Sequence, residues 1–283
     1  MFSTSLSAQE VTGLEVTDLK DFDDEMYLTR GTYSPLNDWA SWHVNEDAAC
    51  TFTVNFWGWT RETCEIIDAM ILLPSPGIDT LLIEKAYSDG YVKYDDWDSS
   101  DRNKYIEKLW KDLQESTNIQ NVNLVNKLEL IRWIVPPELN KEKNYIYYVY
   151  LLKDEYSEVA VTVSALLDRE GYIKFSMLPI DGSLNKDSNP NEFRKSIEAV
   201  LDLYTPYKSN SYEDYAIGDK VSEYGVFGVF AALAGLKWGK VLVTGFLATL
   251  LIFIKKFSFL IFIPFLLVAN KFFKKRPQED EDI

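Results

Sequence analysis

The sequence predicts an α+β domain with a mostly antiparallel sheet and packed helices, followed by a C-terminal transmembrane helical hairpin. Three strand-like segments follow one another closely over residues 144–178, and an amphipathic helix pattern comes directly after them. From Tyr224 to Phe273 the chain is almost wholly apolar. Strands joined by short turns pair antiparallel, and a helix with one apolar face packs on the sheet that they form.

The predicted strands are segments in which apolar residues alternate or β-branched and aromatic residues gather. We expect the strand at Leu128–Val135 to stop at Pro136 and Pro137, because proline donates no backbone hydrogen bond. The segment Asn144–Leu152 is apolar on both faces, which is typical of a strand with neighbours on both sides. Gly171 marks a hairpin turn. The expected strands are Thr51–Trp59, a strand around Tyr91 and Val92 within 84–94, Leu128–Val135, Asn144–Leu152, Glu158–Leu167 and Gly171–Leu178.

Two helices are predicted in the same region. The first covers Ser99–Ser116, with N-cap candidates between Asp98 and Asp101 and an apolar face of Tyr105, Leu109, Trp110 and Leu113. The second starts after Asn189, which can cap it, with Pro190 in the first turn. Its predicted apolar side is Phe193, Ile197, Val200, Leu201 and Tyr204.

Charge is spread unevenly along the 283 residues, which carry a formal net charge of −15. Residues 223–283 carry eight Lys and Arg against five Asp and Glu, a net of +3, so residues 1–222 carry 21 against 39, a net of −18. An acidic body repels phosphate backbones, so no nucleic acid is expected as a partner. The expected regions are an N-terminal region 1–70, irregular over 1–47, a core domain 71–210, a linker 211–222, a membrane anchor 223–276 and an acidic tail 277–283.

Lysines interrupt the apolar run. The two cleanest stretches, Val241–Ile254 and Phe257–Asn270, have 14 residues each, whereas a membrane-spanning helix needs about 20. A charge at mid-bilayer costs about 2.5 kcal/mol or more, so a hairpin that bends at Lys255 and Lys256 is favoured over a single helix. Its helices would extend from about Leu236 to Ile254 and from Phe257 to Phe273, with Tyr224–Gly235 at the interface or against the hairpin. The lipid bilayer is therefore an expected partner.

The compartment of the acidic body is not decided by these patterns. Basic residues flank both ends of the hairpin, so the positive-inside rule is ambiguous. Cys50 and Cys64 can form one disulfide, although two cysteines in a long acidic domain are more often small buried side chains, and the sequence does not decide between the two. Residues 1–11 show no signal-peptide pattern. Either the body stays in the cytoplasm, or the precursor starts further upstream.

Several short segments between about residues 70 and 275 form a recognisable series. They are Gly90-Tyr91-Val92-Lys93-Tyr94-Asp95-Asp96, Trp133-Ile134-Val135-Pro136-Pro137 with Tyr147–Leu151 after it, Tyr212-Glu213-Asp214-Tyr215, Asp219-Lys220-Val221, Glu223-Tyr224-Gly225 and Lys255-Lys256-Phe257. In this order they resemble segments of DUF2167, a family of uncharacterised bacterial membrane-anchored proteins.

The resemblance implies a membrane-anchored protein and supplies no activity. It assigns Tyr224, Gly225, Lys255 and Lys256 to the membrane anchor, and the signal peptide usual in the family favours an extracytoplasmic body. This chain departs from the family in having Val135 where an acidic residue is usual, and Glu138-Leu139 where a Tyr-Asp pair is usual. Neither position can therefore supply a required catalytic group here.

Candidate metal ligands occur in two acidic segments. Asp181, Ser183, Asn185, Asn189 and Glu192 have the spacing of oxygen ligands in an EF-hand loop, but Lys186 replaces the required glycine. A polar strand-to-helix loop is the alternative. A second acidic set, Asp95, Asp96, Asp98 and Asp101, lacks that spacing, and helix capping or a solvated loop explains it equally well. His43 is the only histidine, which excludes a catalytic triad and a multi-histidine metal site.

The combined patterns favour a binding, scaffold or accessory role in the bacterial cell envelope, with envelope proteins as partners. The alternative is a membrane-bound enzyme such as a metal-dependent hydrolase that uses the acidic loops. No catalytic residue is assigned and no cofactor is implied, because the chain contains no GxGxxG, P-loop, GxSxG or CxxC motif.

Overall fold

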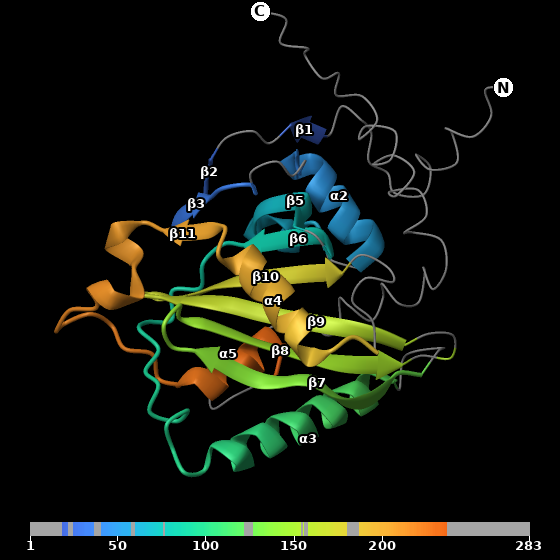
Figure 1. Ribbon diagram of the computed structural model, residues 1–283, viewed down its shortest axis with the longest axis vertical. Coiled ribbons are helices and arrows are strands. Elements are labelled where there is room, and N and C mark those ends of the chain that lie inside the picture. The colour runs from blue at the N-terminus through green and yellow to red at the C-terminus, as the bar shows by residue number, and fades with distance from the viewer. Residues whose placement is uncertain are drawn as a thin grey trace, which may run out of the picture.

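The computed structural model describes residues 19–236, except 22–24, 37–40, 58–59, 76, 122–126, 154, 156–157 and 180–186. An eight-stranded sheet dominates these residues (Figure 1), with every neighbouring pair of strands antiparallel. Its strand order is β1-β4-β5-β6-β10-β9-β8-β7. The strands are β1 (Leu19–Asp21), β4 (Trp42–Val44), β5 (Ile67–Ser75), β6 (Ile78–Glu84), β7 (Glu129–Asn140), β8 (Tyr145–Lys153), β9 (Glu158–Asp168) and β10 (Gly171–Pro179). The predicted α+β class with an antiparallel sheet is confirmed.

The segments β8, β9 and β10 form the meander that the sequence predicts. Gly171 pairs with Asp168 across the tight turn at 169–170, as expected. Eight of the nine residues of β8 are buried, and the strand is paired with β7 on one side and β9 on the other. A strand that is apolar on both faces therefore has neighbours on both sides and layers on both faces, as its composition indicates.

A second, three-stranded sheet pairs two strands from near the start of the domain with one from near its end. It has the order β11-β3-β2 and consists of β2 (Met26–Tyr27), β3 (Gly31–Tyr33) and β11 (Tyr204–Pro206). Tyr33 and Tyr204 lie opposite each other in it and are buried in the same core cluster. The prediction that residues 1–47 are irregular is therefore wrong for this segment. Tyr204 lies in β11 and not on the helix to which the sequence pattern assigns it.

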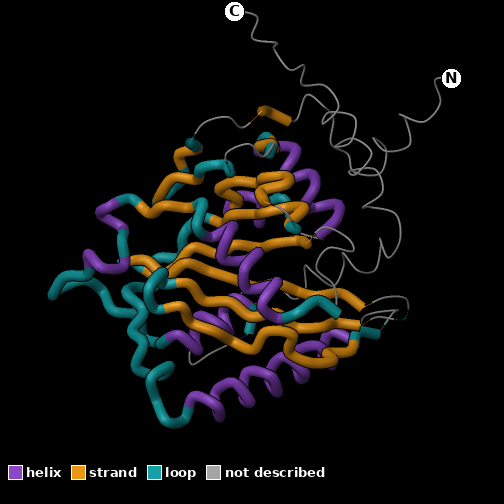
Figure 2. The backbone as a smooth tube through the Cα atoms, in the orientation of Figure 1, coloured by secondary structure: helices purple, strands orange, loops and turns teal. Residues whose placement is uncertain are grey.

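One face of the large sheet is covered by α4 (Pro190–Leu201), which crosses in front of the strands in Figures 1 and 2. Asn189 caps this helix by accepting a hydrogen bond from the Asn191 backbone, and Pro190 occupies its first turn. Both features are predicted correctly. The four buried side chains of α4 belong to the core cluster that contains β5, β8 and β10; they are Phe193, Ile197, Val200 and Leu201.

The opposite face carries α3 (Arg102–Asn121) and α5 (Val226–Leu233), and α5 lies behind the strands in Figure 1. Their buried residues form a second core cluster with β8 and β9. The helix α3 starts three residues later than predicted and continues five residues further. Trp110 on α3 packs on Trp133 of β7, with 4.7 Å between the ring centroids.

The segment Thr51–Trp59 is not a strand, because Glu46–Trp57 forms the helix α2. The side chain of Asn45 accepts a hydrogen bond from the Ala48 N–H at 2.9 Å, which satisfies one free donor of the first turn. Ala48, Ala49 and Phe52 are buried in a third cluster with Met70 and Leu72 of β5. Packing of this helical face overrides the local alternation that predicts a strand.

Two further strand predictions need correction. β7 does not stop at Pro136 and Pro137 but continues to Asn140, with three irregularities in its pairing to β8. Proline is tolerated because β7 is an edge strand with bulges. Residues 85–94 are not a strand and form only single bridges, Tyr87 to Tyr172 and Tyr91 to Val221.

The first part of the apolar run lies inside this domain. Every residue of α5 is buried, and Leu236 after it is 7% exposed. The segment Tyr224–Gly235, which the sequence places at the membrane interface or on the hairpin, instead packs between the sheet and α3. Across the described residues, no helix is both long and apolar enough to span a membrane. The expected hairpin beyond Leu236 lies outside the described residues.

Candidate functional site

The family-like segments at 90–96 and at 212–225, far apart in the sequence, meet at one end of the sheet. The loop 85–96 runs beside the segment 212–225, next to the β9–β10 turn (Figure 1, left). The Tyr91 N–H donates to the Lys220 carbonyl at 2.8 Å, and the Ser222 N–H donates to the Tyr91 carbonyl at 2.9 Å. This junction is the candidate site, because it is where the sequence motifs come together.

Gly90 is required by the close approach of these two segments. Its φ is +107°, and a Cβ at this position would lie 2.8 Å from the Ser222 backbone nitrogen and 2.9 Å from the Lys220 carbonyl oxygen. Backbone atoms held in a ladder cannot move aside, so a side chain here would separate the segments. The glycine of the first motif therefore has a structural reason.

Four tyrosines form a stack at the junction, which we call the tyrosine stack. Tyr94 stacks on Tyr212 with centroids 5.0 Å apart and planes 6° apart. Tyr212 stacks on Tyr91 at 4.4 Å, and Tyr91 stacks on Tyr215 at 4.1 Å. Offset ring pairs of this kind contribute about 0.5–1.5 kcal/mol each beyond their burial. The tyrosine stack therefore binds the two segments together through side chains as well as backbone.

Two hydroxyl groups of the tyrosine stack, those of Tyr94 and Tyr212, form hydrogen bonds within the protein. Tyr212 donates to the Val92 carbonyl at 2.6 Å, and Tyr94 donates to the Asn144 side chain at 2.6 Å. The Asn144 amide in turn donates to Glu213. Burial raises the pKa of both Tyr94 and Tyr212 well above the ordinary value. Neutral, hydrogen-bonded phenols of this kind are poor candidates for a general base.

Asp96 caps α5, although 130 residues separate them. Its two carboxylate oxygens accept the Val226 and Phe227 N–H groups at 2.9 Å each. A carboxylate at a helix N-terminus satisfies free donors and interacts favourably with the helix dipole. Burial raises the pKa of Asp96, and the bonds from Phe227 and Val226 oppose that rise. A Cβ on Gly225 would lie 2.4 Å from the Asp96 carboxyl carbon, so glycine leaves room for the cap.

A second row of polar side chains adjoins the tyrosine stack. Lys174 forms a buried ion pair with Glu84 at 2.6 Å, with side chains 8% and 1% exposed. Tyr87 donates to the other Glu84 oxygen at 2.6 Å and stacks on Tyr172 at 4.8 Å. Removing one partner from a buried charge pair leaves an uncompensated charge, which is strongly destabilising. These groups hold the loop 85–96 on the sheet.

The four aspartates of the second candidate metal set do not converge. Asp95 is exposed, and Asp96 faces α5. Asp98 pairs with Lys141, and Asp101 pairs with Lys104 at 2.7 Å. Within the described residues, no three His, Cys, Asp or Glu side chains are grouped so that they could hold a metal ion.

Of the EF-hand-like candidates, Asn189 and Glu192 are among the described residues. Asp181, Ser183 and Asn185 lie outside the described residues, while Glu192 is exposed in the first turn of α4. Asn189 uses its side-chain oxygen to cap α4.

His43 lies in β4, between β1 and β5. Of the residues assigned to the anchor, Gly225 precedes α5 and Tyr224 donates a hydrogen bond to Asp89. Lys255 and Lys256 lie outside the described residues.

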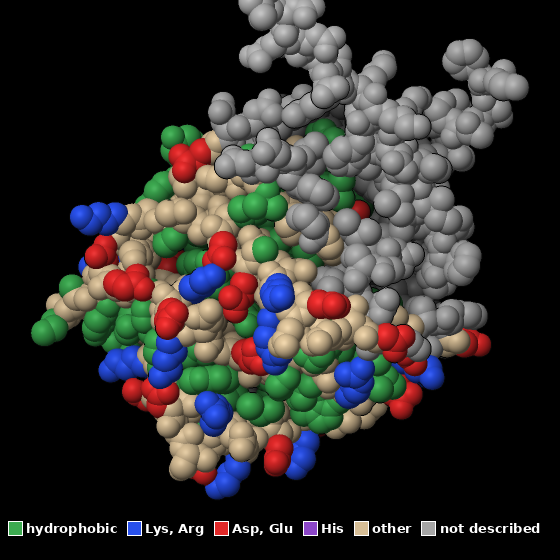
Figure 3. All heavy atoms as spheres, in the orientation of Figure 1, with side chains coloured by type: hydrophobic (Ala, Val, Ile, Leu, Met, Phe, Trp, Pro, Cys, Tyr) green, Lys and Arg blue, Asp and Glu red, His purple; other side chains and the backbone are tan. Residues whose placement is uncertain are grey.

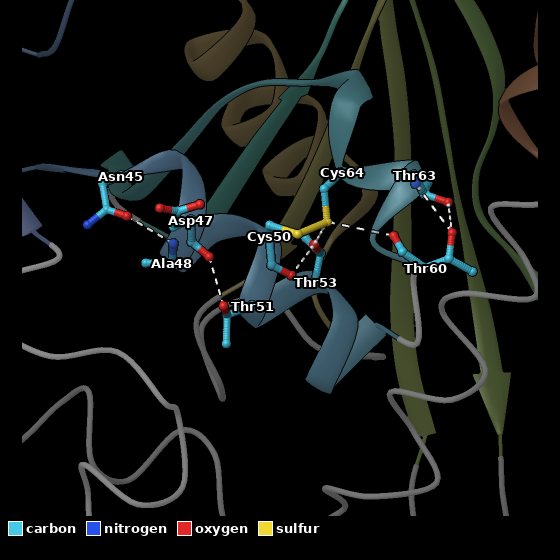
Figure 4. Close-up of a disulfide and its surroundings, with 9 residues drawn as sticks. All are labelled: Asn45, Asp47, Ala48, Cys50, Thr51, Thr53, Thr60, Thr63 and Cys64. Carbon is cyan, nitrogen blue, oxygen red and sulfur yellow. Dashed lines mark hydrogen bonds between the residues drawn. A yellow bond between two sulfur atoms is a disulfide. The ribbon is translucent and has the colours of Figure 1, made fainter.

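Cys50 and Cys64 form a disulfide that links α2 to the short helix η2 (Glu62–Ile66) (Figure 4). Their Cα atoms are 5.2 Å apart, within the usual range for a disulfide. Of the two states that the sequence leaves open for these cysteines, the structure has the disulfide. Bonds of this type persist mainly in oxidising compartments.

The sequence pattern missed the tyrosine stack and the Asp96 cap. Both depend on contacts between segments more than a hundred residues apart, which no local periodicity reveals. The only sequence signal for them was the pair of motif glycines, Gly90 and Gly225, each of which permits a close approach.

Comparison with known proteins gives a family and no activity. No curated protein matches the sequence. A solution structure of cyanobacterial PsbP (CyanoP) from Synechocystis sp. PCC 6803 is similar with a TM-score of 0.34 and 14% identity, over 69% of this chain and 96% of that one. A TM-score this low does not establish a common fold. Residues 38–266, well over half of the chain, match the family described as "Protein of unknown function (DUF2167)". The chain therefore belongs to the DUF2167 family.

Proposed function

We propose that this protein is a membrane-anchored binding protein of the bacterial cell envelope, acting as a scaffold or accessory protein. In this proposal the folded domain lies outside the cytoplasm, the bilayer holds the apolar tail, and other envelope proteins are the partners. Nucleic acid is not a partner, because residues 1–222 carry a net charge of −18.

The observation that carries the anchor is the division of the apolar run. The domain core contains Val226–Ala234 and Leu236, and the apolar residues after Leu236 lie outside the described residues. Those later residues include Val241–Ile254 and Phe257–Asn270, with Lys255 and Lys256 between them. A hairpin that places the two lysines at its bend keeps their charges near the headgroups.

The disulfide between Cys50 and Cys64 supports the extracytoplasmic side. Cytoplasmic thiols are kept reduced, whereas the periplasm and other external compartments allow disulfides to persist. This argument is independent of the lysine distribution, which leaves the orientation ambiguous.

A binding role is favoured over the metal-dependent hydrolase because the polar groups of the candidate site are engaged with each other. Asp96 holds α5, Glu84 holds Lys174 and Tyr87, and Asp219 holds Arg169. A catalytic acid or base must lie within hydrogen-bond distance of the substrate and must have a pKa suited to proton transfer. The residues at this junction instead form an aromatic-rich contact that joins the loop 85–96 to the segment 212–225.

Protease accessibility tests the compartment and the anchor together. In cells that express the full chain, we expect the domain to resist protease in intact cells and to be digested in spheroplasts, with the protein retained in alkali-washed membranes. Thiol labelling of wild-type protein should require prior reduction. The variant Cys50→Ser is the matched control, because it should expose a reactive Cys64 without reduction. A domain that stays protected in spheroplasts and labels without reductant would contradict the proposal.

A further inference from the structure

The turn at residues 216–219 presents an isoleucine to solvent. Ile217 is 103% exposed, the highest value among the large apolar side chains that the structure describes. The segment projects from the end of the sheet in Figure 1 (orange, left), and Figure 3 shows hydrophobic atoms at the same outer edge. Single exposed apolar residues are common, so this exposure alone indicates no function.

The bracing of the turn distinguishes it from an ordinary surface loop. Asp219 accepts two hydrogen bonds from the Arg169 guanidinium, at 2.7 and 2.8 Å, and a third from the Ala216 N–H at 2.8 Å. Gly218 has a φ of +110°, a conformation that side chains disfavour, although a Cβ there would meet nothing within 4 Å. The ring of Tyr215, directly before the turn, is fixed on Tyr91. These contacts brace the backbone of the turn that carries Ile217.

A fixed apolar side chain loses little conformational freedom on binding, which improves affinity without new contacts. Energetically dominant positions of interfaces are preorganised side chains that fill a pocket on the partner, surrounded by polar groups that exclude water. Ile217 is an exposed apolar side chain on a turn whose residues Tyr215 and Asp219 are held by Tyr91 and Arg169.

The charge beside the turn selects the kind of partner. Within residues 212–223, Glu213, Asp214 and Glu223 stand against the single base Lys220, while the fourth acidic side chain, Asp219, is paired with Arg169. Such a rim is repelled by anionic headgroups and attracted to a basic protein surface.

We infer that the 216–219 turn is a docking point for a partner protein that offers an apolar pocket with a rim of Lys and Arg. Ile217 enters the pocket, and the acidic residues of 212–223 face the basic rim. This inference deepens the binding role proposed above and rests on it.

The test uses a photoreactive phenylalanine analogue at position 217 of the full chain, cross-linked in its native membranes. Tyr27, which is 75% exposed in β2, is the matched control position. We expect one protein adduct from position 217 and none from position 27, with a contact peptide that contains both apolar and basic residues. Adding Asp214→Lys and Glu223→Lys should reduce the adduct several-fold.

With the partner so identified and purified, Ile217→Asp should weaken its Kd about tenfold or more, as expected for one dominant contact, while Tyr27→Asp should not change it. Arg169→Ala should weaken binding while the circular dichroism spectrum stays native, because it releases the turn. The inference is overturned by the absence of a protein adduct, by cross-links to lipid, or by cross-links to a second copy of this chain. Membrane retention and protease accessibility would be unaffected by these results, so the proposed anchor and compartment stand or fall separately.

Discussion

The helices α4 and α5 cover opposite faces of the same sheet, yet they have very different sequences. α4 has a buried apolar side and an exposed polar side, whereas all eight residues of α5 are buried. A helix that is apolar on every side belongs either in a protein core or in a bilayer, and its sequence alone does not distinguish the two. In this chain the core contains it, between the sheet and α3.

The two helices also start in different ways. α4 is capped by Asn189, its own neighbour in sequence, and α5 is capped by Asp96, which comes from the loop before α3. A local cap forms wherever the helix forms. A distant cap forms only when the domain has folded, so α5 depends on the whole structure.

The largest expected loss of stability comes from truncating a buried aromatic side chain in either helix. Phe230 in α5 and Phe193 in α4 are both fully buried, so Phe230→Ala and Phe193→Ala should each lower the free energy of unfolding by about 3–5 kcal/mol. Urea unfolding of the detergent-solubilised chain measures both. If Phe230→Ala changed the midpoint by far less than Phe193→Ala, α5 would not be part of the domain core.

The caps give a smaller effect. Asp96→Ala should cost about 1–2 kcal/mol, toward the upper end because it leaves two helix N–H groups without an acceptor. Asn189→Ala should cost about 1 kcal/mol, since its site is exposed. Gly225→Ala should resemble Asp96→Ala, because the added Cβ displaces the Asp96 carboxylate. Equal effects of Asp96→Ala and Asn189→Ala would remove the distinction between a distant and a local cap.

The smallest expected effect is a pH dependence that arises away from both helices. At the start of β6, burial raises the pKa of Asp79 from 3.8 to about 6, against a hydrogen bond from Thr80. Because the folded pKa lies above the unfolded one, stability falls as pH rises from about 4 through about 6, and it stays lower above that range. Asp79→Asn should therefore stabilise the protein by about 1 kcal/mol at pH 7 and by little at pH 4. The value at pH 7 is smaller than the full pKa difference implies, because solvent screens a partly exposed carboxylate. A gain of equal size at both pH values would exclude this cause.

Local patterns were sufficient for the β8–β10 meander and for α4, including its Asn189 cap and Pro190. In both cases the signal and the contact lie within a few residues of each other. The segment Thr51–Trp57 was mispredicted because its alternation is that of a strand, while its packing on β5 and the disulfide from Cys50 favour a helix. The proline pair predicts the end of a strand, because the sequence does not show that β7 lies at the edge of the sheet.

The candidate site was predictable only as a set of motifs. Their order in the sequence identified the family, but the pairing of Tyr91 with Val221 and the cap from Asp96 needed the fold. The exposure of Ile217 also depends on how the 216–219 turn is held by Arg169, a residue from the β9–β10 turn. Long-range contacts of this kind leave no local pattern.

The most direct test of the account is a comparison of two truncated chains. A chain ending at Leu236 keeps α5 and removes the rest of the apolar run, and we expect it to be water-soluble, with a cooperative urea transition and a native near-ultraviolet spectrum. A chain ending at Ser222 removes α5 as well, and the loss of eight buried helix residues should abolish that transition. If the chain ending at Ser222 were folded and as stable as the longer one, α5 would not belong to the domain core, and the division of the apolar run would be contradicted.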